Sequence, residues 1–323
     1  MIKTIHSHHH HLGWNAANTP ALTVAPGDSV ELELLDASGN RIKRDDDASV
    51  IASLAAENAN PLTGPVYVDG AEPGDTLVVE IEEFSHSDWG WTAIIPGFGL
   101  LDQEFTEPLL HISEYDDKQI RFTGDITLPT RPFAGTIGVS PDTRETLSAI
   151  PPHHHGGNMD FCGFVAGTTL YFPVAVEGAL FSVGDGHAAQ GDGEVCGTAI
   201  ETCLGIRVKL SLLKNRSLPT PAARIPGMPD TGEALVTTGI GPDLMTAARD
   251  AVKYMIDQLG HEYGMSPRAG LLPGQLHGQP AYCRSGQCTP LDRGLRVAGS
   301  LLQQGMNSTP FEKFGVFYSH ANL

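Results

Sequence analysis

The chain has 323 residues, with 38 acidic and 20 basic side chains and a formal net charge of −18. That acidity argues against nucleic acid and anionic membranes as partners, because both select basic surfaces. The chain has no run of about 18 apolar residues that could span a bilayer, and it begins without an apolar signal-peptide core. The five cysteines are an odd set with no CxxC pair, which fits reduced thiols. We therefore expect a cytoplasmic protein with no membrane partner.

Strands and turns are predicted through most of the chain. Polar and apolar residues alternate over 29–35 and 76–81, and each stretch follows a Pro-Gly-Asp sequence at 26–28 and 73–75. Proline fixes φ and glycine accepts positive φ, so each Pro-Gly-Asp predicts a tight turn before a strand. Further strand-like runs lie at 21–24, 66–68, 120–122, 170–176 and 205–212.

One clear helix is predicted late in the chain. From Asp243 to Leu259 the apolar residues follow one face of a 3.6-residue period, and Gly260 and Pro267 are the expected stop. The expected fold class is therefore mainly β, with β-sandwich-type domains and a C-terminal helical element. We expect an N-terminal β domain over 1–130, a second β domain with the main site motifs over 131–230, and a helix with an atypical tail over 231–323.

The most informative stretch is Gly184 to Glu194, which reads GDGHAAQGDGE. Asp185 and His187 are two residues apart, as are Asp192 and Glu194, and in extended backbone such pairs project to the same face. Carboxylate and imidazole are ligands that a hydrolytic Zn²⁺ takes, with one more carboxylate available as a base. The alternative interpretation is a Gly/Asp-rich hairpin or a loose Ca²⁺ loop.

A second stretch, PPHHHGGNMD at 151–160, places His155, Asn158 and Asp160 where they can converge on one point. The three successive histidines could instead form a surface tract that binds metal adventitiously. A third stretch, HHHHLGWN at 8–15, includes His11 as a further candidate site residue. Taken together, the first two stretches favour one site built from two loops.

In order and spacing these motifs resemble the acetamidase/formamidase family. The resemblance also includes residues 11–14, 22–28, 62–71 and 132–139, and it covers roughly residues 5–268. It implies hydrolysis of the C–N bond of a short aliphatic amide, such as formamide or acetamide, to a carboxylate and ammonia. It further implies a cytoplasmic homo-oligomer, a dimer or higher, of largely β-sandwich build that uses a divalent metal. Zn²⁺ is the expected ion, with Ca²⁺ as an alternative second or structural ion.

The resemblance brings eight residues to this sequence as site residues, namely His155, Asn158, Asp160, Asp185, His187, Gln190, Asp192 and Glu194. Amide hydrolysis needs a polarised oxygen, a strong nucleophile and a protonated leaving nitrogen. We expect His155, Asp160, Asp185 and His187 to hold the metal, and three of these four suffice if one coordination position stays open. Glu194 is the expected base and acid. Asn158 or a backbone N–H is expected to steady the oxyanion, and Asp192 is a further expected catalytic residue.

Residues 269–323 depart from the family pattern. The family continues with a second apolar helical segment after Ser266-Pro267-Arg268, whereas residues 269–280 show no period and too many glycines and prolines for a helix. A single inserted nucleotide could produce this change, so a frameshifted tail is one hypothesis. A restructured tail with new contacts is the other, and resequencing the gene around Arg268 separates the two.

Two rival functions are open at this point. One is a hydrolase of the same scaffold that acts on a larger or cyclic amide, and the other is a catalytically inactive binding protein. A panel of amides of rising chain length tests the first rival. Stoichiometric metal together with turnover excludes the second.

Overall fold

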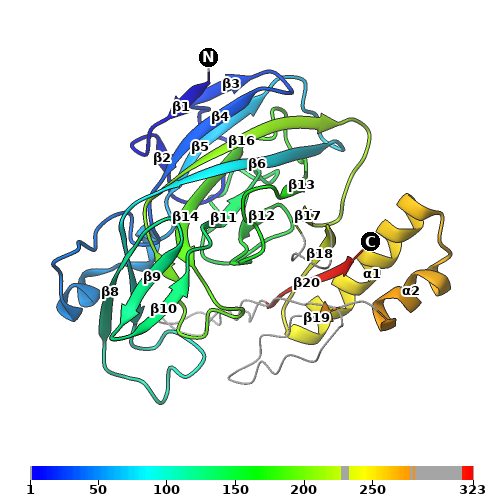
Figure 1. The fold of residues 1–323 in the computed structure, drawn as a ribbon. Helices are drawn as coiled ribbons and strands as arrows, with labels where there is room; N and C mark the ends of the chain where they lie inside the picture. The colour runs from blue at the N-terminus through cyan, green and yellow to red at the C-terminus, as the bar shows by residue number, and fades with distance from the viewer. Residues whose placement is uncertain (1, 227–232, 277–278, 281–314, 323) are drawn as a thin grey trace.

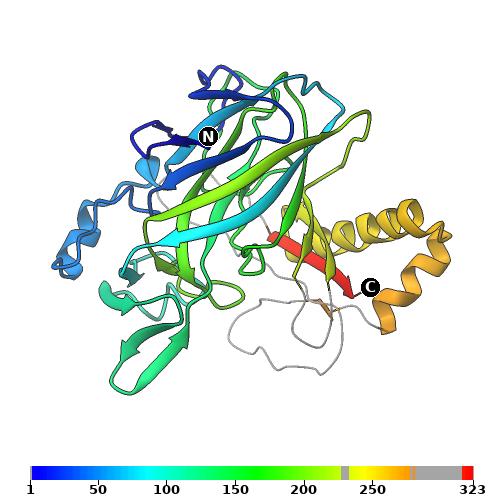
Figure 2. The ribbon, with the colours of Figure 1, turned by 45° about the horizontal axis from the view of Figure 1, so that its top comes forward.

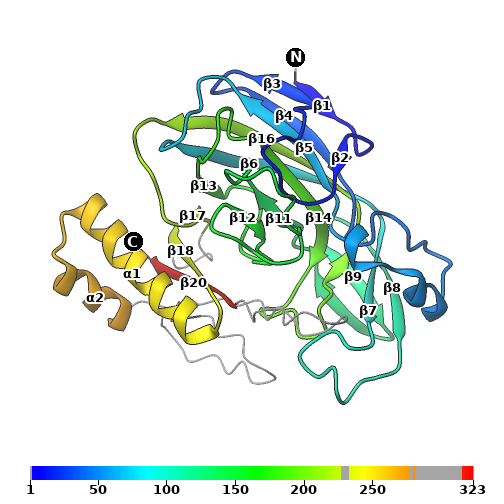
Figure 3. The ribbon, with the colours of Figure 1, turned by 180° about the vertical axis from the view of Figure 1, so that it is seen from behind.

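The computed structural model describes residues 2–226, 233–276, 279–280 and 315–322. Strands dominate this part of the chain, and two helices follow near the C-terminal end. Figures 1 and 3 show the hairpin strands around β8–β10 on one side of the molecule and helices α1 and α2 on the opposite side. The predicted mainly β fold with a C-terminal helical element is confirmed.

The first sheet has nine strands among the described residues, in the order β1-β4-β16-β6-β13-β17-β18-β20-β19. Neighbours run antiparallel except for β1 and β4, which are parallel. Figure 2 shows the long strands of this sheet crossing the front of the molecule. The strands are β1 (Lys3–Ile5), β4 (Ser29–Leu34), β6 (Thr76–His86), β13 (Thr169–Pro173), β16 (Leu204–Leu213), β17 (Ala222–Ile225), β18 (Ala234–Gly241), β19 (Gln279–Pro280) and β20 (Gly315–Asn322).

The two Pro-Gly-Asp turns occupy equivalent places in this sheet. They precede β4 and β6, which lie on the two sides of β16. Gly27 and Gly74 have φ of 97° and 96°, in the left-handed region that glycine tolerates. In each turn the aspartate carboxylate, from Asp28 or Asp75, accepts a backbone N–H three residues earlier, at 3.0 and 2.9 Å. The sequence prediction of two turns is confirmed.

The second sheet has eleven strands among the described residues. Its main path is β10-β9-β8-β7-β15-β14-β11-β12, and β5 pairs with β14, β2 and β3. Both sheets contain strands from either side of residue 130, and the division into three domains stays a prediction. The strands are β2 (His10–His11), β3 (Leu22–Val24), β5 (Leu62–Val68), β7 (Trp89–Ile94), β8 (Leu109–Tyr115), β9 (Gln119–Thr123), β10 (Ile126–Pro129), β11 (Phe133–Gly138), β12 (Gly156–Asn158), β14 (Phe181–Ala189) and β15 (Ile200–Glu201), and two short 3-10 helices cover 48–53 and 56–58.

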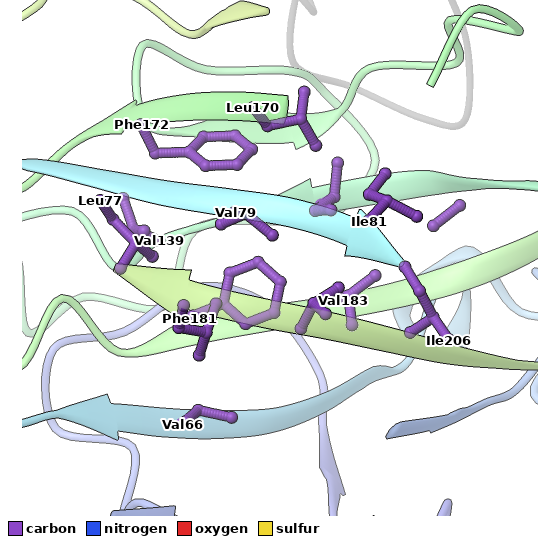
Figure 4. Close-up of a cluster of buried hydrophobic side chains, with 14 of the residues drawn as sticks. Val66, Leu77, Val79, Ile81, Val139, Leu170, Phe172, Phe181, Val183 and Ile206 are labelled. Carbon is purple, nitrogen blue, oxygen red and sulfur yellow. The ribbon is translucent and has the colours of Figure 1, made fainter. Parts of the chain in front are cut away.

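The main hydrophobic core lies between the two sheets. Leu77, Val79 and Ile81 alternate along β6 and face Phe181 and Val183, which alternate along β14 (Figure 4). All five are almost fully buried. Burial of such side chains stabilises the fold by about 1.5–3 kcal/mol each. Asp185 and His187 continue this two-residue spacing toward the end of β14.

Helix α1 (Leu244–Tyr263) packs against β18. The carboxylate of Asp243 caps its N-terminus by accepting the N–H of Thr246 at 2.9 Å. The prediction that Gly260 stops the helix is wrong: the helix continues to Tyr263 and ends at Gly264, which has φ 66°. Glycine inside a helix costs only about 1 kcal/mol, whereas a left-handed C-cap strongly favours it.

Helix α2 (Pro267–Leu276) corrects the expectation that residues 269–280 are too irregular for a helix. Pro267 stands at the first helical position, where its missing N–H costs nothing. Gly270 lies against Ile256 of α1, since an added Cβ would come within 3.3 Å of Ile256 Cγ2. The contact with α1 therefore stabilises α2 even though its glycines and prolines have low helix propensity. Residues 277–278, 281–314 and 323 of the tail lie outside the described residues.

None of the helices within the described ranges is long and apolar enough to cross a membrane. Cys196 and Cys203 carry free thiols. Cys283 and Cys288 lie outside the described residues.

Candidate metal centre and active site

Strand β14 carries the centre of the candidate site. The predicted pair, Asp185 and His187, lies here with His187 Nε2 3.3 Å from Asp185 Oδ1. Only 2% and 1% of these two residues is exposed. Strand β11 pairs with β14 over residues 182–187, and β15 pairs with it from His187 onward. The expectation that the two side chains lie together is confirmed.

Three further carboxylates surround this pair. Asp160, Asp185 and His187 each offer one ligand atom within 4.8 Å of the others, and so do His187, Glu194 and Glu201. Glu201 Oε1 lies 3.3 Å from His187 Nε2, and burial followed by the nearby charge of Asp160 raises the pKa of Glu194. Either group could hold a metal ion, and the two share His187.

Several potential ligand atoms of this site have no hydrogen-bond partner among the described residues. Asp160 Oδ1, Asp185 Oδ1 and both ring nitrogens of His187 are buried and make no hydrogen bond. The 3.3 Å separations from His187 are therefore ion-pair distances without hydrogen-bond alignment. Buried polar atoms are nearly always paired in native proteins, and carboxylate and imidazole are ligands of zinc. A divalent cation at this point would satisfy the two carboxylate oxygens and one ring nitrogen of His187, because an imidazole offers a given ion only one of its nitrogens.

Gly135 on β11 leaves the space between these ligands open. A Cβ built at this position would lie 2.6 Å from both Asp160 Oδ1 and Asp185 Oδ2, and 2.7 Å from His187 Cε1. The backbone carbonyl of Gly135 also accepts the N–H of Asp160 at 3.1 Å. Glycine is therefore required here by close approach, and the geometry fits a group that holds a cation.

The pKa values of the buried side chains show that their negative charges are unfavourable when no cation is bound. Burial, and then repulsion from Asp185, raises the pKa of Asp160 to about 8. Burial raises the pKa of Glu201 to about 7 and the pKa of Glu194 well above its usual range. Burial alone would lower the pKa of His187, but attraction to Glu201 and Asp185 outweighs it and holds that pKa well above its ordinary value. At neutral pH and without a cation, Asp160, with its pKa of about 8, therefore holds a proton.

The backbone is also unusual at the site. Asp160, Asp185 and Glu194 have φ of 44°, 60° and 42°, in the left-handed region. Non-glycine residues seldom adopt this region, and each costs of order 1–3 kcal/mol. Such strain is concentrated at functional sites, where the surrounding structure compensates for it. Here the left-handed backbone turns the carboxylates of these three residues toward one another.

A network of polar side chains contacts Oδ2 of Asp185. Asn60 Nδ2 lies 3.1 Å from Asp185 Oδ2, from Asn158 Oδ1 and from Thr136 Oγ1. Thr136 Oγ1 lies 2.7 Å from Asn158 Oδ1 and 3.1 Å from Asp185 Oδ2. The predicted site residue Asn158 is thus connected to Asp185 through two residues that the sequence analysis did not identify.

His155 does not lie in either ligand group. Its ring stacks on His153 with centroids 5.2 Å apart and meets the edge of Trp14 at 5.0 Å. Burial lowers the pKa of His155 to about 3, and both of its ring nitrogens are unpaired. Its role as a metal ligand stays a prediction. His11 also lies elsewhere, with Nε2 2.9 Å from Ser182 Oγ.

The expectation that Asp192 and Glu194 share a face does not hold. Gly193 and Glu194 both have positive φ, so the backbone is not extended there and the two side chains separate. Asp192 accepts a hydrogen bond from Cys162 Sγ at 3.3 Å and belongs to neither ligand group. Its catalytic role stays a prediction. Gln190 donates to the backbone carbonyl of Asp160 at 2.8 Å and so holds that segment against β14.

Glu201 is the main site residue that the sequence analysis missed. It stands on the short strand β15, opposite His187. One signal was available, because a glutamate between Ile200 and Thr202, in a stretch without other charges, suggests a buried carboxylate. Asn60 gave no comparable signal, because it lies in a loop far along the chain from the two stretches at 151–160 and 184–194.

A cavity of the described residues lies away from this group. It has a volume of about 570 Å³ and lies between α1 and the first sheet, lined by residues that include Arg216, Arg224 and Glu262. None of the site residues contributes to it. The candidate site is therefore identified by its chemistry.

Comparison with known proteins agrees with this geometry. The chain is 28% identical over 262 residues to a formamidase of Methylophilus methylotrophus, an alignment that covers 64% of each chain. It is 29% identical over 268 residues to an acetamidase of Mycolicibacterium smegmatis, covering 63% of this chain and 66% of that protein. The chain thus matches a little under two thirds of the length of these relatives.

A solved structure extends the likeness to the fold. The acetamidase of Bacillus halodurans superposes with a TM-score of 0.84 at 26% identity, covering 98% of this chain and 96% of that chain. The sequence profile of the acetamidase/formamidase family matches residues 3–148 and 143–270, which include every residue of the two ligand groups. The match ends at residue 270, close to the point where the sequence was found to depart. With most of its length and its buried ligand groups inside the match, the chain belongs to the acetamidase/formamidase family.

Proposed function

We propose that the protein hydrolyses the C–N bond of short aliphatic amides, such as formamide and acetamide, to a carboxylate and ammonia. The observation that carries the proposal is the buried convergence of Asp160, Asp185 and His187, which bring carboxylate oxygens and ring nitrogens without hydrogen bonds to one point. The formamidase and acetamidase among its relatives support the same reaction.

The proposed metal is Zn²⁺, held by Asp160, Asp185 and His187. Three protein ligands leave a coordination position open, as hydrolytic zinc sites do. When bound, the ion would act as a Lewis acid toward the amide carbonyl and would make a water molecule more acidic. Calcium prefers an all-oxygen ligand set, so the imidazole of His187 favours zinc at this position.

Glu194 is the proposed proton carrier. Burial, and then repulsion from Asp160, raises the pKa of its carboxyl group. A bound cation would offset the surrounding negative charge and leave Glu194 ionised, so that it would take a proton from the attacking water. Its raised pKa would then let the protonated group deliver that proton to the leaving nitrogen. Such general acid–base catalysis contributes about 10²- to 10⁴-fold.

Asn158 is the proposed donor to the amide oxygen. As that oxygen gains negative charge in the transition state, the carboxamide of Asn158 would donate a hydrogen bond to it. Loss of one such donor typically costs about 10²- to 10³-fold in kcat. Gly135 would keep the space between the metal ligands free of side-chain atoms.

The proposal is tested by ammonia release from formamide, acetamide, propionamide and a cyclic amide. The protein is assayed as purified, after chelator treatment, and after zinc or calcium is restored. We expect chelator-sensitive release that zinc restores, fastest with the shortest amides. A zinc-loaded, folded protein that releases no ammonia from any of these would contradict the proposal. Preference for the cyclic amide would favour the same scaffold acting on a different substrate.

We also propose a cytoplasmic homo-oligomer, as the family resemblance implies. Light scattering of the purified protein gives the oligomeric state directly, and a monomeric mass would contradict this part of the proposal.

A further inference from the structure

The network behind Asp185 determines which end of the Asn158 carboxamide faces outward. A carboxylate oxygen accepts hydrogen bonds and does not donate them when ionised. The structure places the amino nitrogen of Asn60 3.1 Å from Asp185 Oδ2, where it donates to that oxygen, and 3.1 Å from Thr136 Oγ1. These two contacts give the orientation of Asn60.

The orientation of Asn158 follows in turn from Asn60. The same amino nitrogen lies 3.1 Å from the Asn158 carboxamide, and only the oxygen of Asn158 can accept from it. The hydroxyl of Thr136 donates to that oxygen at 2.7 Å. If Asn158 were flipped, two amino groups would face each other at hydrogen-bond distance. Both lone pairs of Asn158 Oδ1 are thus engaged, and its Nδ2 keeps both hydrogens.

Those hydrogens have no partner in the part of the chain that the structure describes. Asn158 keeps 9% of its surface exposed, and its Nδ2 is not among the fully buried unpaired atoms. We infer that Asn60 is a positioning residue, which, together with Thr136, holds the amino group of Asn158 outward as a hydrogen-bond donor for the amide oxygen of the substrate. This inference rests on the proposed function for its purpose, but the orientation itself does not depend on activity.

The backbone of Asn60 decides which substitution tests this cleanly. Asn60 has φ 49°, so alanine would add backbone strain to the loss of the side chain. Asn60→Gly removes the carboxamide and keeps the left-handed φ accessible. Asn40→Gly is the matched control, because Asn40 has φ 58°, is exposed and lies outside the network.

Side-chain hydrogen exchange tests the orientation without any assay of activity. In protein labelled with ¹⁵N-asparagine, the two NH₂ pairs are identified by their loss in Asn60→Gly and Asn158→Asp. We expect the NH₂ of Asn60 to exchange at least tenfold more slowly than that of Asn158, since only the former is fully bonded. An Asn158 pair that exchanges as slowly as the Asn60 pair would overturn the inference.

Kinetic measurements at saturating zinc test the positioning role of Asn60. We expect Asn60→Gly to lower kcat at least tenfold with KM changed less than about threefold, and Asn40→Gly to stay within twofold of the wild type. In an Asn158→Ala background, Asn60→Gly should lower kcat less than about threefold, because its target is already gone. Losses that multiply in the double variant would show that Asn60 acts independently of Asn158.

The two ideas fail separately. Wild-type protein without ammonia release overturns the proposed function, while hydrogen exchange still decides the orientation. Active wild-type protein with an unaffected Asn60→Gly variant overturns the positioning role and leaves the proposed function intact.

Discussion

Substitution of Gly135 by alanine tests whether the space between the carboxylates is the working centre of the protein. The added Cβ would lie 2.6 Å from Asp160 Oδ1 and Asp185 Oδ2 and 2.7 Å from His187 Cε1. Carbon needs about 3.5 Å from such atoms for van der Waals contact, so each ligand must move by nearly 1 Å.

That displacement sets the expected magnitude. Overpacking by one methyl group costs typically 1–3 kcal/mol of stability, which should leave a folded protein. A misplacement of about 1 Å at reacting groups can cost about 10²-fold in rate. We therefore expect Gly135→Ala to fold, to bind zinc at least tenfold more weakly, and to lose about 10²-fold in kcat for acetamide.

The assays are zinc titration by calorimetry, thermal unfolding, and ammonia release at saturating zinc. Gly191→Ala is the matched control, because an added Cβ there meets nothing within 4 Å although Gly191 lies in the Gly184–Glu194 motif that carries site residues. The control should match the wild type in all three assays. Gly135→Ala protein with wild-type zinc affinity and wild-type kcat would refute the assignment of this space to the metal.

Three further predictions concern the charges around the site. Glu201→Gln removes a negative charge 3.3 Å from His187 Nε2, so we expect zinc affinity to fall at least tenfold in calorimetry; unchanged affinity would exclude Glu201 from the centre. Burial raises the folded-state pKa of Glu201 from an ordinary 4.5 to about 7, so metal-free protein should lose about 3 kcal/mol of stability as the pH rises from about 4.5 to 7. Urea unfolding at pH 5 and pH 8 measures this loss, which should shrink in Glu201→Gln protein, and a metal-free protein more stable at pH 8 would contradict it. His155→Gln should keep one zinc per chain, because the ring of His155 packs against Trp14 outside both ligand groups; loss of that zinc would identify His155 as a ligand.

Local patterns in the sequence were enough for the parts of the fold that depend on neighbouring residues. Alternation predicted the strands that became β4 and β6, and the 3.6-residue period predicted the buried face of α1. Asp185 and His187 were paired correctly because they share one strand, where side chains two apart project to the same side. The end of α1 was misplaced, because the choice between Gly260 and Gly264 depends on a backbone conformation that composition does not reveal.

The completed site depended on contacts between distant segments. Glu201 and Asn60 reach Asp185 and His187 from β15 and from the loop before β5, and no spacing in the sequence indicates such proximity. Left-handed backbone turned Glu194 toward the ligands and left Asp192 outside, although the two residues look equivalent in the motif. Sequence periodicity reports which face a residue takes within its own strand. Only the packing of the strands decides which faces meet, because that depends on the register and close approach of segments far apart in the chain.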